Sequence, residues 1–120
     1  MSPATQSAST AAWSDEQHVI ENRNRYCEKF DRVLSILSDT LAPKKPQAGF
    51  YLWATTPITD TSFAQRLYAE QNITVLPGQF LSRSTSEGNP GENKIRMALV
   101  APLDECLDAA NRINNLLSTL

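Results

Sequence analysis

The fold of this chain is decided by one stretch, Asn89–Val100, which reads NPGENKIRMALV. Its Asn-Pro-Gly opening predicts a turn, and the alternation after the turn is typical of a strand. Ile95, Met97 and Leu99 share one face of that strand, and Arg96 lies on the other. An arginine among apolar neighbours indicates an anion partner, because a desolvated guanidinium is costly when unpaired. The stretch therefore predicts a strand that presents Arg96 to an anion.

Hydrophobic periodicity divides the rest of the chain into helices and two further strands. The aromatic-rich run after Gly49 is apolar on both faces, which predicts a strand at the centre of the sheet. The expected elements are, in order, a long helix from a Ser14–Gln17 capping box to Asp39 or Thr40, a strand over 49–55, a helix capped by Asp60 or Thr61 that ends near Gln71, a short strand over 73–76, the Arg96 strand, and a last helix opened by Pro102.

This order predicts an α+β fold: a small three-stranded, largely antiparallel sheet with helices packed on one face, preceded by a long helix. We expect the strand of Phe50 to lie antiparallel beside the Arg96 strand. Apolar spacing also predicts which helix positions are buried. They are Val19, Tyr26, Phe30, Val33, Leu34, Leu37 and Leu41 on the long helix, Phe63, Leu67 and Tyr68 on the second, and Leu103, Leu107, Ala110, Ile113 and Leu117 on the last.

Composition is that of one globular domain with no nucleic-acid or membrane surface. The 120 residues are 41% apolar and 20% charged, with a net charge of −2 and no cluster of Lys and Arg. No apolar run approaches the length of a membrane span, so we expect a soluble, cytoplasmic protein. Cys27 and Cys106 lie far apart and predict free thiols, with a disulfide as the less favoured alternative. The polar segment Met1–Ala12 has little to bury, and we expect it to pack on something outside the chain.

Arg96 is the main candidate for a binding site, and two interpretations of it remain open. It binds a carboxylate ligand through its planar guanidinium, or it forms a structural ion pair with Glu92 or Asp60. Arg83 lies in a long Gly- and Pro-rich loop, of the kind that is often functional, and is the weaker candidate. His18 and the two cysteines lack the companions of a metal or nucleophilic site, so we expect no metal and no catalytic residue.

Three motifs carry a resemblance to a known family. Gly49–Trp53 (GFYLW), Val75–Gly78 (VLPG) and Asn89–Leu99 resemble, in order and spacing, the C-terminal small domain of fold-type I PLP-dependent aminotransferases. Two further runs, Ala11–Val19 and Pro77–Arg83, resemble the succinyldiaminopimelate aminotransferases of bacterial lysine biosynthesis. The likeness covers essentially the whole chain.

The resemblance implies that residues 1–13 pack on a large domain outside this chain and that 14–120 form the small domain. It implies that Arg96 binds the substrate α-carboxylate and that Asn89 and Arg83 approach the substrate. None of the lysines stands in the family's cofactor-binding motif, so the pyridoxal 5'-phosphate (PLP) site is expected upstream.

The implied activity is amino transfer from N-succinyldiaminopimelate to 2-oxoglutarate by a full-length homodimer, with no catalytic or cofactor-binding residue in this chain. The chain alone is then expected to be inactive and to carry no PLP. The alternative is a stand-alone α+β module that binds or senses a small carboxylate through Arg96.

Overall fold

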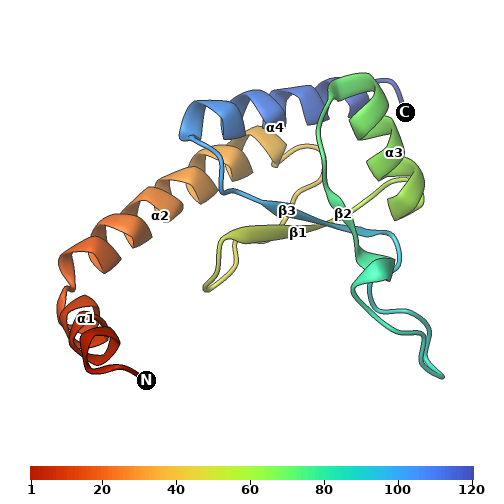
Figure 1. Ribbon diagram of the computed structural model, residues 1–120. Coiled ribbons are helices and arrows are strands. Elements are labelled where there is room, and N and C mark those ends of the chain that lie inside the picture. Colours follow the sequence, from red (N-terminus) through yellow and green to blue (C-terminus); the bar gives the residue numbers. More distant parts are fainter.

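Helices cover one face of a small antiparallel sheet and leave the other face open (Figure 1). This arrangement, in a computed structural model that describes residues 1–120, confirms the predicted α+β fold. The helices are α1 (Pro3–Ser14), α2 (Gln17–Leu37), α3 (Asp60–Gln71) and α4 (Leu103–Leu117). The strands are β1 (Tyr51–Thr55), β2 (Leu76–Pro77) and β3 (Lys94–Ala98), and a 3-10 turn, η1 (Gly78–Phe80), follows β2.

The strand that carries Arg96 lies at the centre of the sheet. The strand order is β1-β3-β2, and β3 is antiparallel to both neighbours, which confirms the expected pairing of the Phe50 and Arg96 strands. The prediction that the first strand is central is wrong, because β1 is an edge strand. Apolar residues on both faces of a strand indicate that both faces are covered. They do not indicate whether the strand has neighbours on both sides within the sheet.

The second strand is shorter than predicted. Asn72 ends α3 in the left-handed conformation (φ 54°), and Ile73 bonds back to the Leu67 carbonyl at 3.1 Å, so the chain turns before it reaches the sheet. Only Leu76 and Pro77 pair with β3. Proline has no backbone N–H to donate, and the pairing ends there.

The core lies between the sheet and the helices, and β3 contributes Ile95 and Met97 to it. Leu52 and Ala54 of β1 face the same way, as period-two alternation requires. The buried apolar side chains are Phe30, Val33, Leu37, Leu41, Leu52, Ala54, Phe63, Leu67, Ile95, Met97, Leu99, Cys106, Ala110, Ile113 and Leu116. They form one continuous cluster, as expected for a single domain.

The long helix begins differently from the prediction. Ser14 is the last residue of α1, and its hydroxyl donates to the Thr10 carbonyl at 2.8 Å, so the Ser14–Gln17 capping box is wrong. The Asp15 carboxylate instead accepts from the Gln17 backbone N–H at 3.0 Å, where α2 starts. A carboxylate near a helix N-terminus also interacts favourably with the helix dipole.

The buried faces of the two later helices are also shifted from the prediction. Tyr68 on α3 is 65% exposed and was wrongly expected in the core, whereas Phe63 and Leu67 are fully buried. On α4 the buried positions include Cys106 and Leu116, and the predicted Leu103, Leu107 and Leu117 are only half-buried. Asp60 does not cap α3: Thr59 precedes the helix, and the Asp60 carboxylate binds elsewhere in the chain.

The N-terminal helix has no buried residue, and Trp13 at its end is 86% exposed. Figure 1 shows α1 and the first part of α2 extending away from the sheet. No helix of the chain combines the length and apolarity that crossing a membrane requires.

We predict that two aromatic residues of α3 differ strongly in how much they contribute to the stability of the fold. Replacing the fully buried Phe63 by alanine leaves a cavity and should lower the free energy of unfolding by about 3–5 kcal/mol. The matched change Tyr68→Ala, on the exposed face of the same helix, should alter it by less than about 0.5 kcal/mol. Urea unfolding followed by circular dichroism measures both. Equal losses at the two positions would contradict this placement of the core.

Candidate functional site

Arg96 is half-buried in the middle of β3, on the face of the sheet that the helices leave open. Its direct cross-strand partners are Trp53 on β1 and Leu76 on β2, so their side chains flank it on that face. The guanidinium carbon lies 5.2 Å from the centre of the Tyr51 ring, within the range of a cation–π contact. Aromatic and aliphatic groups therefore surround this charge.

No carboxylate of the chain pairs with Arg96. The Asp60 carboxylate is buried and accepts hydrogen bonds from Gln79, from its backbone N–H at 2.9 Å and from its side-chain amide at 3.2 Å. Glu92 is exposed and forms no ion pair. The structural ion pair considered for Arg96 is therefore absent, and its N–H donors remain available to an anion.

The loop after β2 is held at its base by a close backbone crossing of two glycines. A Cβ at Gly78 would overlap the carbonyl oxygen of Gly91, and a Cβ at Gly91 would overlap that of Gly78. The Ser82 hydroxyl adds bonds to the Gly78 carbonyl, at 3.1 Å, and to the Asn89 side chain. Only glycine permits this approach, which fixes the position at which the chain enters β3.

The two secondary candidates lie in this loop. The Asn89 side-chain oxygen accepts from the Gly91 N–H at 3.0 Å and contacts the Ser82 hydroxyl, so it stabilises the base of the loop. Its amide nitrogen has no partner in the chain. Arg83 is exposed and forms neither a hydrogen bond nor an ion pair. No hydrogen bond joins either residue to Arg96.

Lys29 makes a contact that nothing in the sequence indicated. Its ammonium donates to the carbonyls of Leu99, at 3.0 Å, and Ala101, at 2.6 Å, and so ties α2 to the chain just after β3. The residues are 70 and 72 positions apart, beyond any local signal. The position of Tyr51 beside Arg96 depends on the register that pairs Tyr51 with Ala98, and the predicted antiparallel pairing left that register open.

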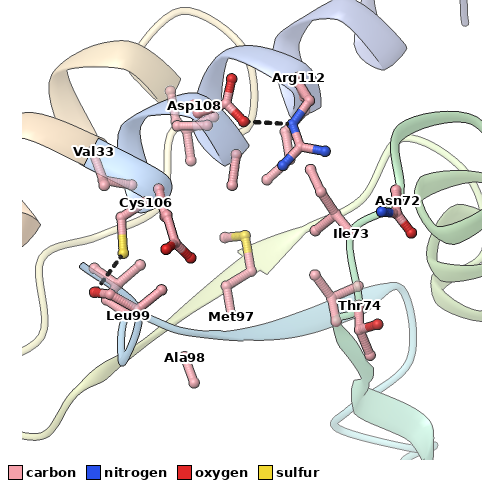
Figure 2. Close-up of a pocket in the computed structure, with 17 residues that line it drawn as sticks. Val33, Asn72, Ile73, Thr74, Met97, Ala98, Leu99, Cys106, Asp108 and Arg112 are labelled. Atoms are coloured by element: carbon pink, nitrogen blue, oxygen red, sulfur yellow. Dashed lines mark hydrogen bonds and ion pairs between the residues drawn. The ribbon is translucent and has the colours of Figure 1, made fainter. Parts of the chain in front are cut away.

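A cavity of about 390 Å³ lies between α4, β3 and the Asn72–Val75 segment (Figure 2). Met97, on the helix-covered face of β3, points into it. Two of the charged side chains that line it already have partners within the chain. The Arg112 guanidinium lies 2.9 Å from the Asp108 carboxylate and donates to the Gln71 carbonyl. Arg96 does not line this cavity, which is therefore separate from the candidate carboxylate site.

No group of three His, Cys, Asp or Glu side chains comes together as a metal site. His18 is exposed on α2 and pairs with Asp15 at 3.2 Å, and its hydrogen bond lowers the pKa of that carboxyl. Both cysteines are free thiols, as predicted, with Cys27 exposed and Cys106 buried. Burial raises the pKa of the Cys106 thiol, and the nearby Lys29 ammonium partly opposes the shift.

The two thiols should differ in reactivity. In the folded protein at mildly alkaline pH, iodoacetamide should alkylate Cys27, while Cys106 stays unmodified until denaturant is added. Because the folded-state pKa of Cys106 is raised, its contribution to stability is complete below the ordinary thiol pKa. That contribution is lost as the pH rises through the raised value. Peptide mass spectrometry after timed labelling measures the two rates, and equal rates would contradict the burial of Cys106.

Comparison with known proteins gives the family. A family model described as aminotransferase class I and II matches residues 1–113. The LL-diaminopimelate aminotransferase of Syntrophobacter fumaroxidans is 33% identical over 110 residues, which cover 89% of this chain and 27% of that protein.

Solved structures agree with that match. An aminotransferase from Neisseria meningitidis is 50% identical with a TM-score of 0.94, covering 98% of this chain and 30% of that one. A probable N-succinyldiaminopimelate aminotransferase from Thermus thermophilus is 31% identical with a TM-score of 0.75, covering 90% and 28%. The chain thus spans less than a third of the length of these proteins. Because the family match extends over nearly all of its residues, the chain belongs to the class I and II aminotransferases.

Proposed function

We propose that this chain is the small domain of a PLP-dependent aminotransferase and that Arg96 binds the α-carboxylate of the substrate. The observation that carries the proposal is a half-buried guanidinium on an open sheet face with no carboxylate partner in the chain. A carboxylate offers two oxygens that match the planar fork of donors on arginine, which gives orientation as well as charge.

We propose that the N-terminal segment 1–13 packs on the large domain and that residues 14–120 form the small domain. Support comes from α1, which has no buried residue and ends at the exposed Trp13. A helix of 12 residues without a buried face gains little stability within this chain. The open face of the sheet, with Arg96 and Trp53, would then lie toward the large domain.

PLP is the cofactor that the family implies for the full-length enzymes, and the residues of this chain do not fit it. Holding PLP requires a free lysine and a cradle for phosphate. The Lys29 ammonium is engaged by two backbone carbonyls, and Lys45 pairs with Asp31. Lys44 and Lys94 are exposed and line no phosphate-binding glycine loop. We propose that PLP is bound by other parts of the longer protein.

We propose that the full-length protein is a cytoplasmic homodimer that transfers the amino group of N-succinyldiaminopimelate to 2-oxoglutarate. Support for a diaminopimelate-type substrate comes from the names of two relatives, an LL-diaminopimelate and a probable N-succinyldiaminopimelate aminotransferase. Amino donor and oxo-acid acceptor both carry an α-carboxylate, so one arginine serves both. We also propose Arg83 and the free amide nitrogen of Asn89 as secondary contacts to the remainder of the substrate.

Removing the guanidinium should weaken substrate binding. In the full-length enzyme, Arg96→Ala should lower kcat/KM for the amino donor by about ten- to a hundredfold, the range for a lost charged hydrogen bond. Arg96→Lys should recover only part of the loss, because an ammonium lacks the two-pronged geometry. The matched control Arg32→Ala removes an exposed arginine of α2 that lies 3.7 Å from Glu28. Steady-state kinetics measures all three, and unchanged kcat/KM in Arg96→Ala would refute the carboxylate role.

Donor preference separates the two substrate assignments. We expect the full-length enzyme to transfer the amino group of N-succinyl-LL-diaminopimelate with higher kcat/KM than that of free LL-diaminopimelate, because the runs Ala11–Val19 and Pro77–Arg83 resemble the succinyldiaminopimelate enzymes. Glutamate formation from 2-oxoglutarate measures both reactions. A preference for the free diamine would replace the succinyl assignment and leave the Arg96 proposal intact.

A further inference from the structure

The geometry assigns a positioning role to Tyr51: we infer that its ring sets the direction of the Arg96 guanidinium for carboxylate binding. The inference rests on the proposed function of Arg96 and adds the residue that orients it. Tyr51 lies on β1 opposite Ala98, and is therefore the diagonal neighbour of Arg96 on the open face.

The ring holds the guanidinium without using its hydrogen-bond donors. The guanidinium carbon lies 5.2 Å from the ring centre, and the chain supplies Arg96 with no hydrogen bond or ion pair. A cation–π contact acts through the face of the ring, so the N–H groups at the edge of the guanidinium stay free. A carboxylate in the same place would occupy those donors and compete with the substrate. Trp53, although directly opposite Arg96, makes no such contact.

The position of Tyr51 is itself supported by two further aromatic rings. The Phe50 and Tyr51 rings pack in a T-shaped arrangement, with 5.4 Å between ring centres and an interplanar angle of 84°. Phe50 in turn lies 6.3 Å from Tyr26 on α2. Such pairs contribute to stability beyond their buried area. The three rings form an aromatic row that connects Arg96 to α2.

The Tyr26 end of the aromatic row is also linked, through Lys29, to the chain just beyond the strand that carries Arg96. The Lys29 ammonium lies 5.0 Å from the centre of the Tyr26 ring and binds the carbonyls of Leu99 and Ala101, just beyond β3. Both ends of the row are therefore tied to the same segment of chain. A ring anchored in this way gives Arg96 one preferred direction before any substrate arrives, which lowers the cost of binding.

The test is a double-mutant cycle in the full-length enzyme, because a residue that acts through Arg96 has no effect once Arg96 is gone. Tyr51→Leu removes the ring and should raise KM for the amino donor about two- to tenfold, the range for one cation–π contact. Tyr51→Phe keeps the ring, and the Tyr51 hydroxyl has no partner in the chain, so KM should stay at the wild-type value. In an Arg96→Ala background, Tyr51→Leu should change KM no further.

Two additional variants separate positioning from loss of fold. Tyr51→Val, which suits an edge strand, should reproduce the KM increase of Tyr51→Leu with an unchanged urea midpoint. The matched control Tyr68→Leu alters an exposed tyrosine of α3 and should leave KM unchanged.

The outcomes distinguish the two proposals. If Arg96→Ala leaves KM unchanged, the carboxylate function itself is overturned. If Arg96→Ala raises KM but neither Tyr51→Leu nor Tyr51→Val does, the positioning role is overturned and the carboxylate function stands. An equal effect of Tyr51→Leu with and without Arg96 would also overturn the positioning role.

Discussion

The alternation of side chains along β3 is the constraint on which the rest of the structure depends. Ile95 and Met97 of β3, and Leu99 just beyond it, must face the helices, because burying three such side chains contributes several kcal/mol to a net stability of only about 5–15 kcal/mol. A slip of one residue would expose all three and bury Arg96. The same pattern that forms the core therefore places the arginine on the open face of the sheet. Stability and the candidate binding site are two consequences of one register.

Contacts between residues that are far apart in the sequence fix β3 at both of its ends. The crossing of Gly78 and Gly91 sets where the chain enters the strand, and the Lys29 ammonium holds the carbonyls just beyond its exit. Between these points the Tyr51 ring lies beside the guanidinium. None of these contacts uses the N–H groups of Arg96, so its donors stay free. The arrangement suits a group that has to meet a ligand from outside this chain.

Much of this could be predicted from the sequence, and the failures share physical causes. Alternation placed Arg96, and the pairing of β1 with β3 was expected and confirmed. The position of β1 at the sheet edge was missed, because apolar faces carry no information about neighbouring strands. Tyr68 was misplaced because helical spacing cannot fix the exact edge of a buried stripe. The Lys29 contact could not be found, since it joins residues whose proximity only the tertiary fold creates.

The central claim is that Arg96 recognises the charge of a substrate α-carboxylate. It is tested most directly by comparing an amino-acid substrate with its α-carboxamide, which keeps the shape and removes the charge, in the full-length wild-type enzyme and in Arg96→Ala. The account predicts that the wild-type enzyme strongly prefers the carboxylate in kcat/KM and that Arg96→Ala loses most of that preference. A preference of the same size in both proteins would contradict it.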